Sequence, residues 1–165
     1  MWGKDLKKTE LSQVQWSPDS KKLLFATTSG ELQLFDGQGT FISKLNNFCN
    51  EGVSVKVSSI AWYNGANGYI EPNIPCLAVC YENGKIQILR SEADTSPIIV
   101  TTGLRHLNMK WNNNGAILAV SGTEEGVTNV DGEVKDVALV VFYSPLGQLI
   151  RTMKVPGSVI SSLSW

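Results

Sequence analysis

VQWSPDSKKLLFATTSGELQLFD, residues 14–36, holds a tryptophan, a Pro-Asp turn, an apolar run, a Ser-Gly turn and a second apolar run. Short apolar runs between turn residues indicate β-strands. A Ser-Gly pair between two such runs indicates a hairpin, because glycine adopts the positive φ that a tight hairpin turn requires. The stretch therefore predicts successive strands that fold back on one another along the chain.

Tryptophans recur and mark repeats of this stretch. Trp16, Trp62, Trp111 and Trp165 are 46 to 54 residues apart. An apolar residue lies two positions before each of them, and the position between is mostly polar. This alternation with period two indicates a half-buried strand that ends in the tryptophan. The indole ring can wedge between neighbouring sheets, because it buries a large area while its N–H still finds an acceptor.

Further apolar segments follow each of the first three tryptophans. Residues 31–35 and 85–89 correspond almost position by position, as ELQLF and KIQIL. Units of four strands with a period of about 40 to 50 residues are typical of β-propeller blades. No segment has a sustained helical period, so we predict an all-β fold. The second, third and fourth strands are expected at 22–27, 31–35 and 40–45, then 76–81, 85–89 and 98–101, then 116–120, 137–142 and 148–153.

The repeat also sets the expected domain boundaries. We expect residues 1–165 to be part of one β-propeller, with about three four-stranded antiparallel blades at 12–46, 57–102 and 104–155. Residues 1–11 are expected to be the last strand of a preceding blade, and residues 158–165 the first strand of the next. Because closed propellers have about 4 to 8 blades, this predicts a partial propeller, an excerpt from a longer chain.

Charge and hydropathy exclude several classes of partner. The net charge is −1, which gives no electrostatic reason to bind nucleic acid or an anionic membrane. No apolar run reaches the roughly 18 residues that span a bilayer. We therefore expect no nucleic-acid partner and no direct membrane insertion.

The cysteines do not form a recognisable framework. Cys49, Cys76 and Cys80 are odd in number and have no C-x-x-C spacing, which favours a reducing compartment over disulfides. On one extended strand Cys76 and Cys80 would be about 13 Å apart, too far to share a metal ion through that strand alone. We interpret them as small core residues.

The sequence also lacks a catalytic motif. The single histidine, His106, lies near the start of a predicted strand, and no nucleophile elbow, Walker loop or His-Glu-x-x-His motif is present. Most carboxylates fall in predicted turns, where turn chemistry explains them. We expect no catalytic residue, cofactor, metal site or small-molecule substrate. The alternative is an enzymatic propeller whose site is assembled by blades beyond this sequence.

Two insertions are the candidate partner-binding regions. Gly65–Pro75 lengthens the hairpin after Trp62, and the acidic segment Gly122–Asp136 interrupts the third blade. Loops longer than about 12 residues are usually functional or disordered. For the first we favour an ordered structural cover over a partner contact, and for the second a solvated disordered loop over a partner contact. The candidate partner-binding residues are Tyr69, Ile70, Glu71, Glu124, Glu125, Asp131 and Glu133.

The repeat resembles the WD-repeat family, in which the first strand of a unit ends in a Trp-Ser-Pro-Asp-like turn. Residues 16–19 match this element, and residues 111–115 are a relaxed version. The family's Trp-Asp pair is replaced at 35–36, 89–90 and 142–143, and its Gly-His pair is absent. The family's hydrogen-bonded network therefore cannot be transferred, and the blade edges are expected to be held by apolar packing.

Irregular segments narrow the resemblance. They are similar to the first propeller of the WD-repeat subunits of intraflagellar transport complex A. A WD-repeat branch of the tubby-like family is also similar but fits the Glu-Pro and Pro-Cys segments less well. The segments concerned are 2–6, 62–63, 68–72, 75–80, 83–84, 118–122 and 154–157.

The resemblance implies a non-catalytic interaction scaffold. It implies two N-terminal propellers followed by a helical solenoid, with a role in retrograde ciliary transport and in delivery of membrane proteins into cilia. The implied partners are other subunits of the transport complex and ciliary membrane-protein cargo or adaptors. The implied locations are the cilium or flagellum, the basal body and the cytoplasm. A tubby-like adaptor is the alternative.

Overall fold

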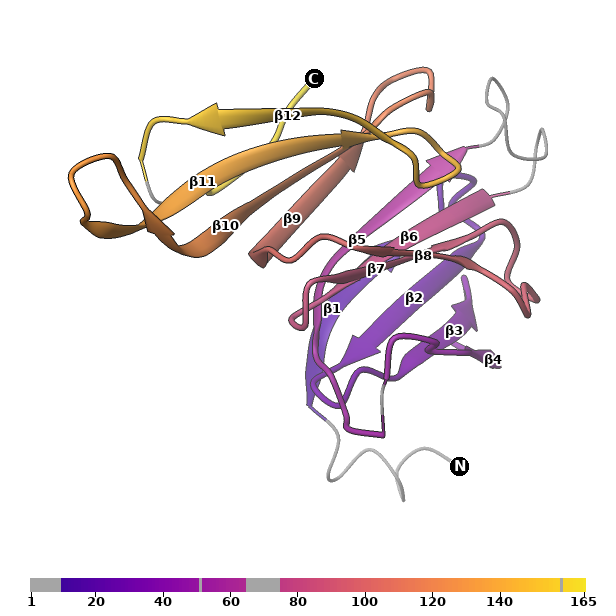
Figure 1. The fold of residues 1–165 in the computed structure, drawn as a ribbon. Helices are drawn as coiled ribbons and strands as arrows, with labels where there is room; N and C mark the ends of the chain where they lie inside the picture. Colours follow the sequence, from indigo (N-terminus) through magenta and orange to yellow (C-terminus); the bar gives the residue numbers. More distant parts are fainter. Residues whose placement is uncertain (1–9, 51, 65–74, 158) are drawn as a thin grey trace.

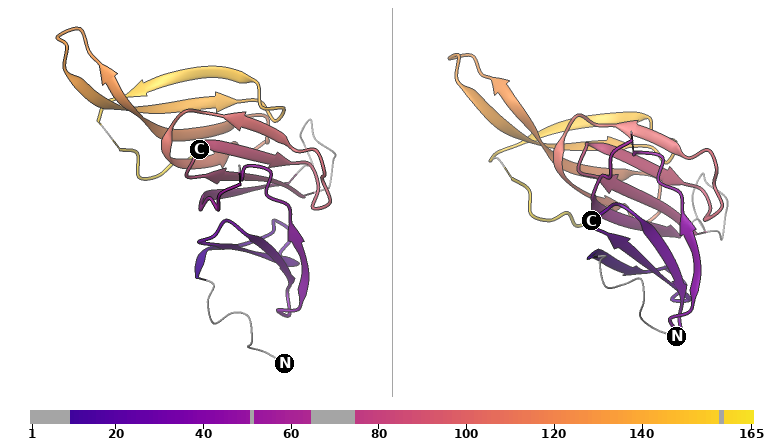
Figure 2. Two further views of the ribbon diagram at one scale, coloured as in Figure 1. Left: turned by 60° about the horizontal axis from the view of Figure 1, so that its bottom comes forward. Right: turned by 90° about the horizontal axis from the view of Figure 1, so that it is seen from below.

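The computed structural model describes residues 10–50, 52–64, 75–157 and 159–165. Its strands form three antiparallel sheets of four strands, and in each sheet every strand pairs with the next along the chain. The sheets follow one another in chain order, with the faces of neighbouring sheets packed together (Figures 1 and 2). The predicted all-β class and partial propeller architecture are confirmed.

The first sheet contains β1 (Leu11–Trp16), β2 (Lys22–Thr27), β3 (Leu32–Asp36) and β4 (Phe41–Leu45). The second contains β5 (Val57–Asn64), β6 (Pro75–Tyr81), β7 (Lys85–Leu89) and β8 (Ile98–Thr101). The third contains β9 (Arg105–Trp111), β10 (Leu118–Thr128), β11 (Val134–Tyr143) and β12 (Leu149–Val155).

Short polar side chains close the turn that follows the tryptophan. The Ser17 hydroxyl donates to Asp19 Oδ1 at 2.6 Å and accepts from the backbone N–H of Lys22 at 3.0 Å. Asn112 takes the place of Ser17 in the third sheet, where its Oδ1 accepts from the N–H of Ile117 at 3.0 Å. Different residues thus satisfy the same turn geometry, which is why the motif survives in relaxed form.

One apolar core lies between the first and second sheets. Because side chains alternate along a strand, β2 and β3 direct one set toward the second sheet and the other set away from it. Burial of each large aliphatic side chain contributes about 1.5–3 kcal/mol. The buried members are Leu24, Ala26, Leu32, Leu34, Leu45, Cys49, Val57, Ile60, Leu77, Val79, Tyr81 and Leu89.

The second sheet packs on both of its faces. Leu77 and Val79 of β6 belong to the first core, whereas Ala78 and Cys80 belong to a second core against the third sheet. This explains the nearly continuous apolar run CLAVCY, since a strand covered on both sides needs no polar face. The middle sheet therefore holds the outer two together.

Two tryptophans make the same hydrogen bond to the sheet that precedes them along the chain. Trp111 Nε1 donates to the carbonyl of Ala61 at 3.2 Å, and Trp165 Nε1 donates to the carbonyl of Lys110 at 3.3 Å. Each acceptor directly precedes the tryptophan of the preceding sheet, so the contact repeats with the blade. The predicted wedge with a hydrogen-bonded N–H is confirmed at Trp111, which is 6% exposed, whereas Trp165 makes the hydrogen bond but is 49% exposed.

The other two tryptophans differ from this prediction. Trp62 packs against the first core, but its buried Nε1 has no hydrogen-bond acceptor among the described residues. Trp16 is 49% exposed, because the face on which it lies has no sheet packed against it within the described part of the chain. Apolar packing alone therefore holds Trp62 in place.

A buried glutamine ties the second sheet to the chain that leads into it. Gln87 is fully buried in β7. Its Oε1 accepts from the N–H of Phe48 at 2.8 Å, and its Nε2 donates to the carbonyl of Asn46 at 2.8 Å. A buried amide with both groups satisfied fixes the connector between the first and second sheets.

The segment 122–136 is not the disordered loop that we favoured. Residues 118–128 and 134–143 pair with each other along a single long hairpin, with an irregularity between Glu124 and Val127. β-branched residues on both sides of an Asn-Val-Asp-Gly turn favour this strand pairing over a solvated loop. The hairpin extends away from the rest of the third sheet (Figure 1).

The flanking strands remain predictions. The proposed strand at 1–11 falls largely on residues 1–9, which lie outside the described residues. Residues 159–165 form no strand, although Trp165 makes the repeated tryptophan contact. A strand requires a partner strand, and none lies beside this segment in the described residues.

Apolar side chains also occupy the outward face of the first sheet. The rings of Phe25 and Phe35 lie 4.7 Å apart, and Phe35 and Phe41 lie 5.6 Å apart, on the face opposite the first core. Val14 and Phe41 are about half exposed there. On the outward face of the third sheet, Met153 is 42% exposed.

The contrast between two equivalent glutamines can be tested. Gln87→Leu should lower the free energy of unfolding by about 2–4 kcal/mol, because the backbone groups of residues 46 and 48 lose their buried partners. Gln33→Leu, at the equivalent but half-buried position of β3, should change it by less than about 1 kcal/mol. Urea unfolding of the two variants measures the difference, and equal effects would contradict the role given to Gln87.

The two outward faces predict self-association. We expect chain 1–165, prepared alone, to self-associate. Association buries exposed apolar patches of this kind and removes them from water. Phe41→Lys combined with Met153→Lys should reduce association measured by light scattering. Gln38→Lys with Gln148→Lys adds the same charge at exposed turn positions and serves as the control. A monodisperse wild-type monomer would argue against this reading of the faces.

Candidate functional site: the axial pocket and the projecting hairpin

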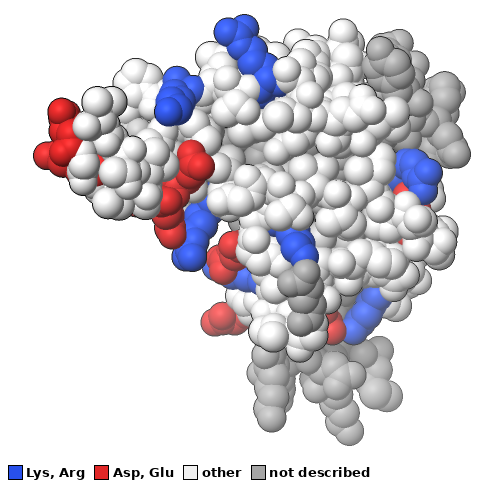
Figure 3. Space-filling model, in the orientation of Figure 1, with Lys and Arg blue, Asp and Glu red and all other residues white. Residues whose placement is uncertain are grey.

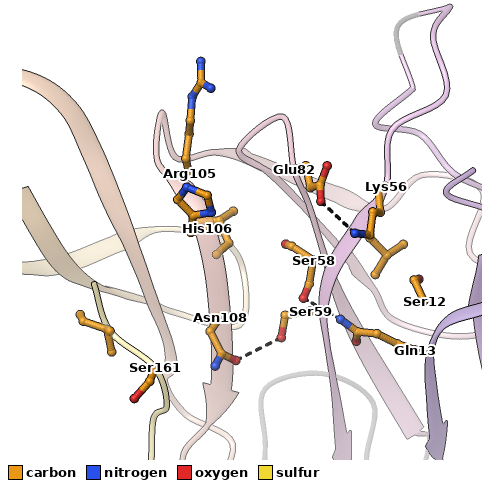
Figure 4. Close-up of a pocket in the computed structure, with 13 residues that line it drawn as sticks. Ser12, Gln13, Lys56, Ser58, Ser59, Glu82, Arg105, His106, Asn108 and Ser161 are labelled. Atoms are coloured by element: carbon orange, nitrogen blue, oxygen red, sulfur yellow. Dashed lines mark hydrogen bonds and ion pairs between the residues drawn. The ribbon is translucent and has the colours of Figure 1, made fainter. Parts of the chain in front are cut away.

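A polar pocket of about 750 Å³ lies where the first strands of the three sheets approach one another. It is lined by residues 12–13 of β1, 56–59 at the start of β5, Glu82, 105–108 of β9 and 160–161 (Figure 4). In a propeller the first strand of each blade lies nearest the central axis, so this pocket is the axial one.

Two polar contacts in the pocket join neighbouring sheets. Gln13 Nε2 donates to the carbonyl of Ser58 at 2.6 Å, which joins the first sheet to the second. Ser59 Oγ and Asn108 Oδ1 lie 3.4 Å apart, which joins the second sheet to the third (Figure 4). These two contacts stabilise the arrangement of the three sheets.

The charged groups of the pocket are also paired. Lys56 Nζ lies 3.4 Å from Glu82 Oε1, and Arg105 Nε lies 3.0 Å from Glu125 Oε2. His106 is exposed and has a φ of 54°, a left-handed conformation that non-glycine residues adopt rarely. Within residues 10–50, 52–64, 75–157 and 159–165, no three His, Cys, Asp or Glu side chains are placed to share a metal ion.

The two cysteines whose side chains are described lie in the cores. Cys49 and Cys80 are buried, and neither is in a disulfide among the described residues. Burial raises the pKa of the Cys80 thiol, and its Sγ lies 3.2 Å from the sulfur of Met109. Because the thiolate is the reactive form, a buried thiol with a raised pKa is inert. The prediction that Cys49 and Cys80 are core residues is confirmed.

The described residues include no helix that is long and apolar enough to cross a bilayer.

The first predicted partner-binding region cannot be placed. Tyr69, Ile70 and Glu71 lie outside the described residues. Their proposed role as a cover or a partner contact remains a prediction.

The second predicted region is the outer half of the long hairpin. Glu124 and Glu125 lie in β10, whereas Asp131 and Glu133 lie in the turn that joins β10 to β11. We call residues 124–137 the arm. Nearly all of the arm is exposed, and acidic side chains gather at its end (Figure 3).

Side-chain hydrogen bonds give the arm a defined turn. Asn129 Oδ1 accepts from the backbone N–H groups of Asp131 and Glu133 at 3.0 and 2.9 Å. Gly132 has a φ of 79°, which a side chain would disfavour. At the irregularity in β10, the N–H of Gly126 donates to Asp136 Oδ1 at 3.2 Å. The Asn-x-x-Gly spacing in the sequence is the signal that would have identified this hairpin.

The arm carries more negative than positive charge. Glu124, Glu125, Asp131, Glu133 and Asp136 stand against one lysine, Lys135. Lys135 pairs with Glu133 at 2.6 Å, and Glu125 pairs with an arginine of β9 at 3.0 Å. Exposed pairs of this kind contribute about 0–1 kcal/mol, so the arm keeps a net negative field.

The turn of the arm can be tested by substitution. Asn129→Ala removes both side-chain hydrogen bonds, at a cost of about 1–2 kcal/mol, and should speed amide exchange in Val127–Val134 roughly 5- to 30-fold. Exchange in Leu118–Val120 should stay unchanged, because those residues belong to the core. Asp131→Ala, whose side chain plays no part in the turn, is the matched control. Equal exchange in both variants would contradict this account of the turn.

Comparison with known proteins identifies a matching family and several sequence relatives. The family described as WDR35/TULP4 N-terminal, a β-propeller family, matches residues 1–165. WD repeat-containing protein 35 from Rattus norvegicus is 46% identical and that from Homo sapiens 45% identical, each over 100% of this chain. Tubby-related protein 4 from Mus musculus is 23% identical over 84% of it. The chain spans 14% of the length of the first two relatives and 10% of the third.

Solved structures share the fold. A chain in the crystal structure of the mitotic checkpoint complex has a TM-score of 0.56 at 13% identity, covering 89% of this chain and 54% of that one. The WD40 domain of coronin from Toxoplasma gondii has a TM-score of 0.60 at 10% identity, covering 88% of this chain and 34% of that one. At these identities the likeness concerns the arrangement of strands alone.

Proposed function

The chain belongs to the WDR35/TULP4 N-terminal propeller family, and we propose that it is a scaffold segment of a WD-repeat subunit of intraflagellar transport complex A. In this role it binds other proteins and catalyses no reaction. The protein acts in retrograde transport along cilia and in delivery of membrane proteins into them. The subunit concerned is intraflagellar transport protein 121.

The observation that carries the proposal is the identity of 45–46% with WD repeat-containing protein 35 over the whole chain. The match covers 100% of this chain, so it is not confined to the strands that any propeller requires. Tubby-related protein 4 is related at about half that identity. Identity at this level over the whole chain favours a shared role over a shared fold alone.

The geometry supports a binding role in a second way. Gln13, Ser59 and Asn108 of the axial pocket make contacts between the sheets, whereas the hairpin arm and the loops are exposed. Propeller rims bind partners through such loops, where buried apolar anchors give affinity and polar groups around them give selectivity. The proposed partners are other subunits of the transport complex and ciliary membrane-protein cargo or adaptors.

The proposed locations follow from this role. The protein is proposed to reside in the cilium or flagellum, at the basal body and in the cytoplasm. The alternative function, a tubby-like adaptor, is favoured by the family that joins WDR35 with TULP4 and by the 23–25% identity to tubby-related protein 4. It predicts cargo binding without membership of the transport complex.

Affinity purification of the full-length protein from ciliated cells tests the proposal. We expect the other subunits of intraflagellar transport complex A to co-purify in constant ratio. Depletion should leave transported proteins accumulated at the ciliary tip, because return transport fails while outward transport continues.

Two controls separate a specific role from a folding defect. Gln87→Leu, which weakens the packing of the second sheet, should reduce co-purification in proportion to the loss of folded protein, whereas Gln33→Leu should leave it unchanged. If wild-type protein binds cargo but none of the complex subunits, the adaptor alternative replaces the proposal.

A further inference from the structure

The arm offers one free strand edge next to the sheet. β12 pairs with β11 as far as Val155, opposite Ala138. Pro156 follows, and because proline has no N–H it cannot continue a ladder. On that side, Val134–Val137 of β11 therefore have no strand beside them in the described part of the chain.

The backbone groups at this edge point outward in a predictable order. The N–H of Asn129 donates to the carbonyl of Glu133, so Glu133 directs its backbone groups toward β10. In an antiparallel ladder successive residues alternate, and the extra residue at the irregularity lies in β10. The N–H and C=O of Val134 and Asp136 thus face the open edge.

A groove of about 840 Å³ runs along the same edge. Val127, Val137 and Val155 line it together with Lys154 and Asp136. Its floor combines apolar side chains with an unpaired strand edge, which is the combination that strand addition uses: the backbone gives affinity and alternate side chains enter apolar sites.

An added strand would stabilise the exposed arm. A two-stranded hairpin alone is marginally stable in water, and within the described residues the arm beyond Thr123 consists of two strands. Val134 is 66% exposed and Val130 is fully exposed at the turn. A third strand would cover apolar surface that the rest of the chain leaves open.

The charge of the arm indicates which kind of segment would bind at the open edge. The arm carries five carboxylates and Lys135, and Lys154 of β12 also lines the groove, so five negative charges stand against two positive ones, a net charge of −3. Within the described residues Glu124 and Asp131 form no ion pair. This negative field attracts basic segments and repels acidic ones.

From these observations we infer that the open edge of β11 binds an extended basic segment of a partner protein, in which apolar residues alternate with Lys or Arg. The segment adds as a strand beside Val134–Val137 and continues the sheet where β12 ends. The inference rests on the proposed scaffold function and names the surface and the partner chemistry.

Synthetic peptides test the inference on the purified full-length protein. The probe is a labelled seven-residue peptide of alternating Lys and Val, compared with an alternating Glu and Val peptide and with a Lys-Pro peptide of equal charge that cannot form a strand. We expect the Lys-Val peptide to bind, measured by fluorescence anisotropy, and to slow amide exchange at Val134 and Asp136. The other two peptides should bind at least about tenfold more weakly.

A matched pair of variants tests the edge itself. Val134→Pro removes an outward N–H that makes no bond within the arm and should weaken binding of the Lys-Val peptide about tenfold. Val134→Thr keeps the donor and the strand preference and should bind within about threefold of wild type. Unchanged amide exchange in Leu118–Ser121 confirms that Val134→Pro is folded. If that variant unfolds, Glu124→Gln with Asp131→Asn replaces it and should weaken binding by reducing the charge.

Three results would overturn the inference. Equal binding of the Lys-Pro peptide would show charge attraction without strand addition, tighter binding of the Glu-Val peptide would reverse the charge argument, and protection confined to other residues would place the site elsewhere. These measurements need only the purified protein. A failure of the scaffold proposal appears instead as missing complex subunits in the purification from cells, so the two failures are distinguishable.

Discussion

Burial of both faces of the second sheet is the constraint on which the rest of this structure depends. Its strands alternate between two apolar cores, so neither face tolerates a charge and neither outer sheet can be moved without exposing one core. Apolar burial is non-directional and does not by itself fix how far one sheet is rotated on the next. The angular register must come from directional contacts.

Hydrogen bonds across the sheets supply that register. Trp111 reaches the carbonyl before Trp62, and Gln87 holds the connector from the first sheet. The polar lining of the axial pocket does the same nearer the axis through Gln13 and Ser59. This chain lacks the residues of the WD-repeat family's polar network. Apolar packing, together with a few amide and indole hydrogen bonds, therefore holds the sheets to one another.

The elements closest to the tryptophans were predictable from sequence, because period-two alternation and turn residues are local signals. The role of Gln87 was not, since KIQIL reads as a half-exposed strand and only the neighbouring connector shows that the glutamine is buried. The prediction of a disordered loop for the acidic segment 122–136 was wrong. Its charges indicated a loop, whereas its valines and the Asn129 turn stabilise a hairpin. Of the predicted contact residues, Glu124, Glu125, Asp131 and Glu133 come together on that arm.

The arm and the three packed sheets differ in what their polar groups contact. In the three sheets, Gln13, Ser59 and Asn108 at the axis make contacts between sheets, so substitutions of these residues act on stability first. In the arm, strand pairing continues past the last residue covered by β9, where Arg105 pairs with Thr123, and beyond the end of β12. A hairpin that outgrows its sheet keeps backbone groups and valines exposed without helping the core. Such a feature persists at little cost to the fold, and its chemistry is therefore free to serve recognition.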